Sequence, residues 1–111
     1  MRIPWEQEEA VVLIDAYLNN GSSLKIPASE IQHISDLLRE RGRILGIPVD
    51  DKFRNPTGIN MQIACIHYIA TNGQSGMANA SKLFYDTYEL ARKDPEAFQK
   101  ILLSFHQRFG E

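Results

Sequence analysis

The sequence has little of several features that would narrow its function at once. Only one cysteine occurs in 111 residues, so no disulfide can form within the chain. Purely apolar runs are short, with Val11–Ile14 as an example, and fall far below the roughly 20 residues that a membrane-spanning helix needs. The formal net charge is only −2, which argues against binding nucleic acid by bulk charge alone. These shortages exclude a disulfide scaffold and predict a chain that does not enter a membrane.

The length and the first residues place the chain in a broad class. At 111 residues we expect one domain spanning 1–111, long enough to bury a core without staples. The start, MRIPWEQEEA, turns acidic where the apolar part of a signal peptide would begin. Together with the single cysteine, this start predicts a cytoplasmic protein.

Apolar residues recur at helical spacing along most of the chain. The pattern predicts five helices, at about 4–19, 27–45, 56–70, 79–93 and 95–109. No segment alternates with a period of two, so we predict no sheet. The fold class is therefore all-α. The first three helices, within 1–70, are expected to form a trihelical, helix-turn-helix-like unit, and residues 78–110 a C-terminal helical hairpin.

Capping signals mark several of these boundaries. Asn55 and Asp94 each precede a proline, and that order is typical of an N-cap followed by the first helical position. Residues 71–81, TNGQSGMANAS, form the longest small and polar stretch. We expect that stretch to be a mobile loop, or one that presents its backbone.

The most informative stretch for function is the basic segment 39–54. It carries a local charge of +2, whereas the first fifteen residues carry −3. Phosphates are held by Arg, Lys and helix N-termini, and side-chain amides pair with adenine edges. The segment leads into the helix at 56–70, so it predicts a nucleic-acid site. Its candidate residues are Arg41, Arg43, Lys52 and Arg54 for phosphates, with Asn60 and Gln62 for bases.

Structural alternatives exist for the same residues. The basic segment can equally be a solvated helix face followed by a surface loop, and Asp50 and Asp51 beside Lys52 favour that interpretation because they repel phosphate. Arg54 can instead pair with an acid of the first helix and tie the turn down. Phe53 is expected to anchor the loop in the core.

No residue pattern predicts catalysis or a metal. The three histidines fall on different predicted helices, and Cys65 with His67 matches no structural zinc spacing. Ser75 in GQSG follows no strand, as a nucleophile elbow would require. We therefore expect a non-enzyme with no cofactor and no metal.

Three stretches resemble a helical module of bacterial multidomain proteins. In those proteins the module often stands at the N-terminus, with sigma-factor-like helix-turn-helix or nuclease parts elsewhere in the chain. The stretches are IPWEQEEAVVLIDAYL, ISDLLRERGRILGIPVDDKFRNPTGINMQ and GQSGMANASKLFYDTYEL, which cover most of the chain. The most specific element is Phe53, Arg54, Asn55 and Gly58. The resemblance implies an accessory domain that contacts nucleic acid, in defence or transcription, without chemistry of its own.

A second, fainter likeness concerns the start of the chain. Trp5 followed by Glu6, Glu8 and Glu9 is similar to a Myb or SANT repeat, although those repeats usually carry several tryptophans and this chain has one. The lead hypothesis is thus a non-catalytic DNA-binding accessory domain. The alternative is a protein-interaction or oligomerisation module in a larger bacterial assembly.

Overall fold

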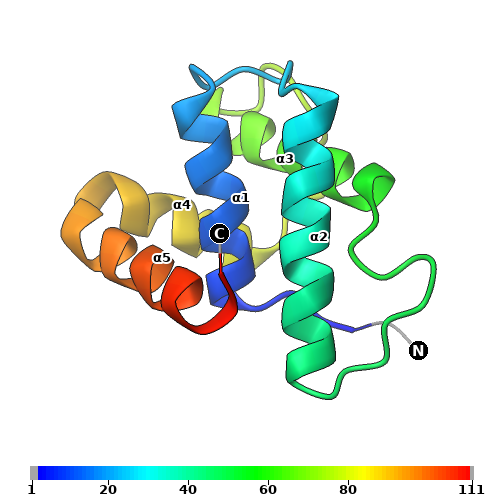
Figure 1. Ribbon diagram of the computed structural model, residues 1–111. Helices are drawn as coiled ribbons and strands as arrows, with labels where there is room; N and C mark the ends of the chain where they lie inside the picture. The colour runs from blue at the N-terminus through cyan, green and yellow to red at the C-terminus, as the bar shows by residue number, and fades with distance from the viewer. Residues whose placement is uncertain (1–2, 111) are drawn as a thin grey trace.

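The computed structural model describes residues 3–110 and shows an all-helical domain, with no strand among those residues (Figure 1). Its helices are α1 (Gln7–Asn19), α2 (Ala28–Ile44), α3 (Pro56–Ala70), α4 (Lys82–Lys93) and α5 (Pro95–Phe109). The predicted all-α class with five helices is confirmed, and α4 and α5 pack together as a hairpin-like pair. Within the described residues, every helix is too short or too polar to cross a bilayer.

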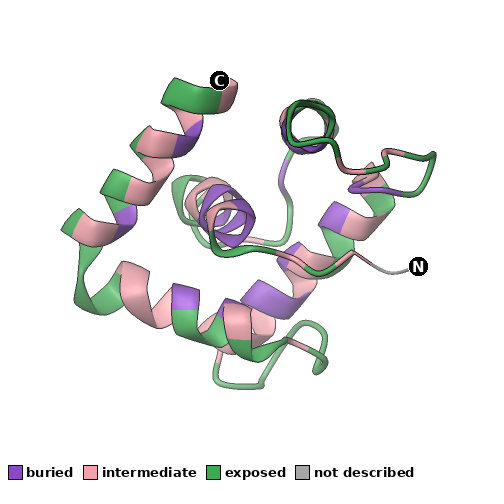
Figure 2. Ribbon diagram, turned by 90° about the horizontal axis from the view of Figure 1, so that it is seen from below, coloured by how far each residue is buried: buried purple, intermediate pink, exposed green. Residues whose placement is uncertain are grey.

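The first helix occupies the centre of the fold. α1 contacts each of the other four helices, and Figure 2 looks along it with the others arranged around it. Its side chains Ala10, Val11, Leu13, Ile14 and Tyr17 have no exposed surface. A helix that is apolar on nearly every side is typical of such an interior position.

The other helices each turn one apolar stripe toward α1. The largest buried side chains from these helices are Ile34 and Leu38 of α2, Ile59, Ile63 and Ile66 of α3, Phe84 of α4, and Phe98 and Phe105 of α5. Full burial of a side chain of this kind contributes roughly 1.5–3 kcal/mol. Packing of these side chains against the shared central helix and against one another therefore stabilises the domain.

Two of the predicted helix starts are confirmed in atomic detail. The Asn55 side chain accepts a hydrogen bond from the Gly58 N–H at 2.8 Å, at the start of α3. The Asp94 side chain accepts one from the Ala97 N–H at 3.1 Å, at the start of α5. Each cap satisfies a backbone donor that the first helical turn leaves free.

Two other predicted starts are wrong by a few residues. α1 begins at Gln7 rather than near Pro4, because the Glu6 N–H donates to the Glu9 carboxylate at 3.0 Å and fixes Glu6 as the N-cap. α4 begins at Lys82 rather than about residue 79, because Ser81 is the N-cap there. A polar side chain marks each boundary: Glu9 accepts from the Glu6 N–H at the start of α1, and Ser81 accepts from the Phe84 N–H in α4.

The loop at 71–81 is attached to α3 rather than free of it. The Met77 N–H donates to the Ala64 carbonyl inside α3 at 3.1 Å, and the Ser75 N–H donates to the Thr71 hydroxyl at 3.1 Å. Gly76 has a φ of +102°, and a Cβ there would overlap the Ala64 carbonyl oxygen. The predicted mobile or backbone-presenting segment therefore uses part of its backbone to bind its own helix.

The connection between α2 and α3, residues 45–55, folds back on α2. Phe53 is 7% exposed and lies against Gly42, which confirms its predicted role as an anchor. Asp50 accepts hydrogen bonds from the backbone of Lys52 and Phe53, and Arg39 donates to the carbonyls of Asp50 and Phe53. This connection is much longer than the roughly three or four residues of a helix-turn-helix turn.

Candidate functional site

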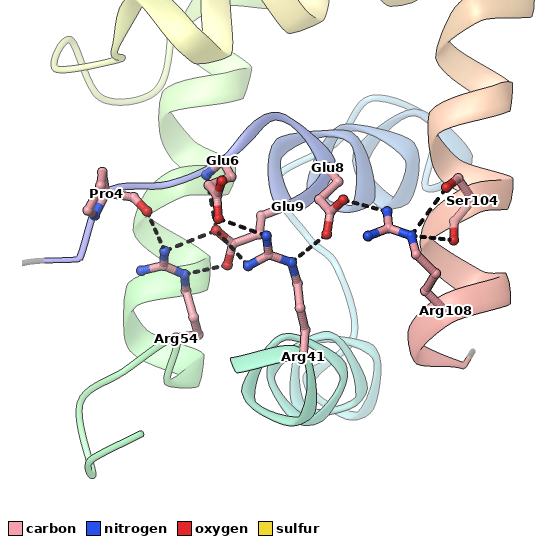
Figure 3. Close-up of polar contacts among 8 residues, drawn as sticks. All are labelled: Pro4, Glu6, Glu8, Glu9, Arg41, Arg54, Ser104 and Arg108. Atoms are coloured by element: carbon pink, nitrogen blue, oxygen red, sulfur yellow. Dashed lines mark hydrogen bonds and ion pairs between the residues drawn. The ribbon is translucent and has the colours of Figure 1, made fainter. Parts of the chain in front are cut away.

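Three glutamates at the start of α1 meet three arginines that arrive from different parts of the chain (Figure 3). The arginines come from α2, from the turn before α3, and from the last turn of α5. Ion pairs connect Glu6, Glu8, Glu9, Arg41, Arg54 and Arg108, and these six residues are called the arginine network below. The negative charges also suit their place at a helix N-terminus, where the helix dipole is positive.

Arg54 is a buried cation of the arginine network, enclosed by a carboxylate and two aromatic rings. Its Nε and Nη2 donate to the two carboxylate oxygens of Glu9 at 2.7 and 3.0 Å, and Nη2 also donates to the Pro4 carbonyl at 3.0 Å. The guanidinium lies over the Trp5 ring at 4.0 Å and the Phe53 ring at 4.5 Å. Its side chain is 7% exposed and that of Glu9 is fully buried. Sequence analysis left pairing of Arg54 with an acid of the first helix open, and the structure shows that pairing.

Arg41 contacts all three glutamates of the arginine network. It donates to Glu8 at 2.5 Å and to Glu6 at 2.8 Å, and its side chain is 4% exposed. Burial opposes the charge of Arg41, but the hydrogen bonds to Glu6 and Glu8 outweigh it and raise the pKa of the guanidinium. Arg41 therefore remains a cation that is committed to carboxylates of its own chain.

Arg108 closes the arginine network from the C-terminal side. Its Nη2 donates to Glu8 at 2.6 Å, and its Nε contacts Ser104. Burial alone would raise the pKa of Glu8, but the hydrogen bonds from Arg108 and Arg41 overcome it and lower that pKa below its ordinary value. Glu8 is thus a carboxylate held in its ionised form by two arginines.

The predicted phosphate-binding edge is not brought together on one open face. Arg41 and Arg54, two of the predicted phosphate contacts, do not face solvent, because both guanidinium groups are buried against glutamates of α1. Arg43 is exposed and pairs with Glu40 at 3.3 Å. Lys52 is exposed in the connection before α3.

The predicted base-reading residues both lie in the first half of α3. Asn60 is exposed, whereas Gln62 is half-buried. The nearby helix start is partly occupied by the chain itself, because the Asn55 side chain takes the Gly58 N–H. Nucleic-acid binding by these residues stays a prediction, now without the two buried arginines.

A groove runs along one side of α1, and the sequence did not predict it. Its apolar lining includes Val12 and Ala16 of α1, Ile34 and Leu37 of α2, and Leu102 of α5. The groove has a volume of about 510 Å³. That size falls within the roughly 300–1,000 Å³ of ligand-binding clefts.

The rim of this groove carries titratable groups from all three helices. Asp15 comes from α1, Glu30 and His33 from α2, and His106 from α5. The Nδ1 of His106 lies 2.9 Å from the Gly110 carbonyl. Since a carbonyl only accepts, Nδ1 carries the proton in the neutral ring and Nε2 is left as an acceptor.

Asp15 is the feature of the sequence that could have revealed the groove. It is the one charged residue in the apolar stretch 10–18 of α1, AVVLIDAYL. The side chain is half-buried, and burial together with the nearby Glu30 charge raises its pKa, although His106 and the Asn19 amide act in the opposite direction. A carboxyl group whose pKa is raised by burial and that lines a groove is a candidate for a functional site.

Comparisons with protein-family models, with curated proteins and with solved structures find no match to this chain. The arginine network and the groove over α1 are thus the two features from which a function can be argued.

Proposed function

We propose that this domain is a non-catalytic interaction module, an accessory part of a larger assembly, that holds a segment of a partner protein in the groove over α1. The observation that supports it is the groove itself. An apolar lining supplied by three helices gives a partner side chain a place to bury, and polar groups at the rim can fix its orientation.

The distribution of positive charge favours a protein partner over nucleic acid. Phosphate contacts need cations that face solvent, and Arg41 and Arg54 are buried in ion pairs. Breaking a buried pair strands a charge and costs roughly 3–5 kcal/mol, so neither arginine can be released cheaply to a phosphate. The exposed cations Arg43 and Lys52 lie beside Glu40 and beside Asp50 and Asp51.

DNA binding through a helix-turn-helix-like arrangement is the competing outcome. In that case Arg43 and Lys52 would contact phosphates while Asn60 and Gln62 approach bases. Binding of this kind weakens steeply as salt rises. Fluorescence anisotropy with duplex and single-stranded DNA at two salt concentrations measures it directly. We expect no salt-dependent binding; a salt-dependent affinity that disappears in the Arg43→Ala/Lys52→Ala variant would replace our proposal with the nucleic-acid one.

The positive test uses a library of random displayed peptides selected on the immobilised domain. His33 is exposed and lines the groove, so His33→Trp should obstruct it with little effect on folding. Gln32 is the neighbouring exposed residue on the same helix and does not line the groove, which makes Gln32→Trp a matched control. We expect selected peptides to lose binding to the first variant and to keep it with the second. Peptides that bind both variants equally would contradict the groove as the site.

A further inference from the structure

Among the described residues, the groove is lined by carboxylates and by no lysine or arginine. The carboxylates are those of Asp15 and Glu30. The other titratable side chains in the lining are those of His33 and His106. The groove therefore combines apolar side chains such as Ala16, Leu37 and Leu102 with two carboxylates.

Asp15 and Glu30 differ from the three glutamates of the arginine network. Glu6, Glu8 and Glu9 each have an arginine partner within the arginine network. Among residues 3–110, neither Asp15 nor Glu30 has an ion pair. The one hydrogen bond to Asp15 comes from the Asn19 amide at 3.2 Å.

We propose, on the basis of the protein-binding function above, that the groove takes a short segment that joins apolar side chains to a lysine or arginine. The apolar side chains lie on Ala16, Leu37 and Leu102, and Asp15 and Glu30 receive the cation. A guanidinium or ammonium group supplies the cationic partner that neither carboxylate has among residues 3–110.

The surroundings of Asp15 explain why a bound cation would be favourable. Burial disfavours the ionised form of Asp15 and raises its pKa, and the charge of Glu30 adds to the effect. A cation placed between the two carboxylates favours the ionised form of Asp15 and therefore opposes both of these effects on its pKa.

The size of the groove limits the occupant. A volume of about 510 Å³ accommodates a few side chains and not a broad protein surface. The partner is therefore expected to present a single short segment, whose specificity lies in one basic side chain next to its apolar anchors.

Two displayed libraries of short peptides test the charge directly. One library has lysine fixed at the centre and the other has glutamate, with all other positions random. We expect binders from the lysine library only. A selected peptide should lose about tenfold or more in affinity for the Asp15→Asn and Glu30→Gln variants, as expected when a charged hydrogen bond is lost. Glu40→Gln, on the same helix but outside the groove lining, is the control and should bind normally.

A charge swap makes the test specific. Glu30 is exposed, so Glu30→Lys should fold, which circular dichroism checks. This variant should reject the lysine peptide and accept the same peptide carrying glutamate. If the Asp15→Asn, Glu30→Gln and Glu30→Lys variants bind the peptide with unchanged affinity while His33→Trp still blocks it, this inference is overturned. The proposed interaction module is then still supported. No binders from either library overturn both.

Discussion

Arg54 and Glu9 form a two-point ion pair between the turn before α3 and the interior of the first turn of α1. Both nitrogen–oxygen contacts are 3.0 Å or shorter, and the two side chains are 7% and 0% exposed. Arg54 also adopts a φ of +49°, an uncommon backbone conformation for a residue other than glycine. The pair therefore joins the start of the central helix to the connection that leads into α3.

The first prediction concerns this pair. Arg54→Ala leaves the Glu9 carboxylate buried without its main partner, so the free energy of unfolding should fall by roughly 3–5 kcal/mol. Lys52→Ala changes an exposed cation two residues away and should alter it by less than about 0.5 kcal/mol. Urea unfolding followed by circular dichroism measures both. Similar values for the two variants would show that the pair contributes little.

A second prediction compares two glycines with positive φ. Gly76→Ala places a Cβ against the backbone of α3, 2.7 Å from the Tyr68 nitrogen, whereas Gly21→Ala meets nothing within 4 Å. Both variants carry the cost of a left-handed conformation, roughly 1–2 kcal/mol. Overpacking should add a further roughly 1–3 kcal/mol at Gly76 only. Thermal unfolding of the two variants side by side separates these contributions, and equal melting temperatures would rule out close packing of the loop on α3.

The third prediction concerns acid. The folded-state pKa of Glu8 lies below its ordinary value of 4.5, so its contribution to stability is present above that value and is lost as pH falls through the folded-state pKa. Glu8→Gln should therefore lower stability at neutral pH and flatten its decline in acid. Glu96→Gln, which changes a glutamate with an 84% exposed side chain, serves as the control. Unfolding free energies across the acidic range test this, and an unchanged slope in Glu8→Gln would refute it.

The fourth prediction concerns Asp15, whose pKa is shifted in the opposite direction to that of Glu8. The folded-state pKa of Asp15 is raised above 3.8, so its favourable contribution is complete below that value and is lost as pH rises through the folded-state pKa. At neutral pH the ionised Asp15 therefore costs stability, and Asp15→Asn should unfold at an equal or higher urea concentration than the natural chain. The same variant should bind the lysine peptide more weakly. A marked loss of stability would mean that Asp15 serves the fold.

The helices were predictable because their signals are local. Asn55 with Pro56, and Asp94 with Pro95, place a cap directly before a residue suited to the first turn, and the structure has both caps. The start of α1 was missed because its N-cap is Glu6, a residue that is not a typical cap, fixed by a hydrogen bond to Glu9. Boundaries set by such a return contact cannot be read from residue type alone.

The candidate sites were harder to predict because they depend on contacts between distant parts of the chain. The composition of the basic segment 39–54 is the same whether its arginines bind phosphates or the acidic start of the chain. Only the packing of α2 against α1 brings Arg41 to Glu6 and Glu8. The groove likewise needs α5 beside α1 and α2 before Asp15 acquires surroundings.

The central position of α1 has a consequence for synthesis on the ribosome. Phe105 and Arg108 are made about 90 residues after α1, yet Phe105 packs in the core around that helix and Arg108 pairs with its Glu8. Until they emerge, the nascent chain holds an apolar helix with Glu8 facing one arginine instead of two. Closure of the core around α1 thus waits until residue 108 has left the ribosome, whatever follows it in the chain.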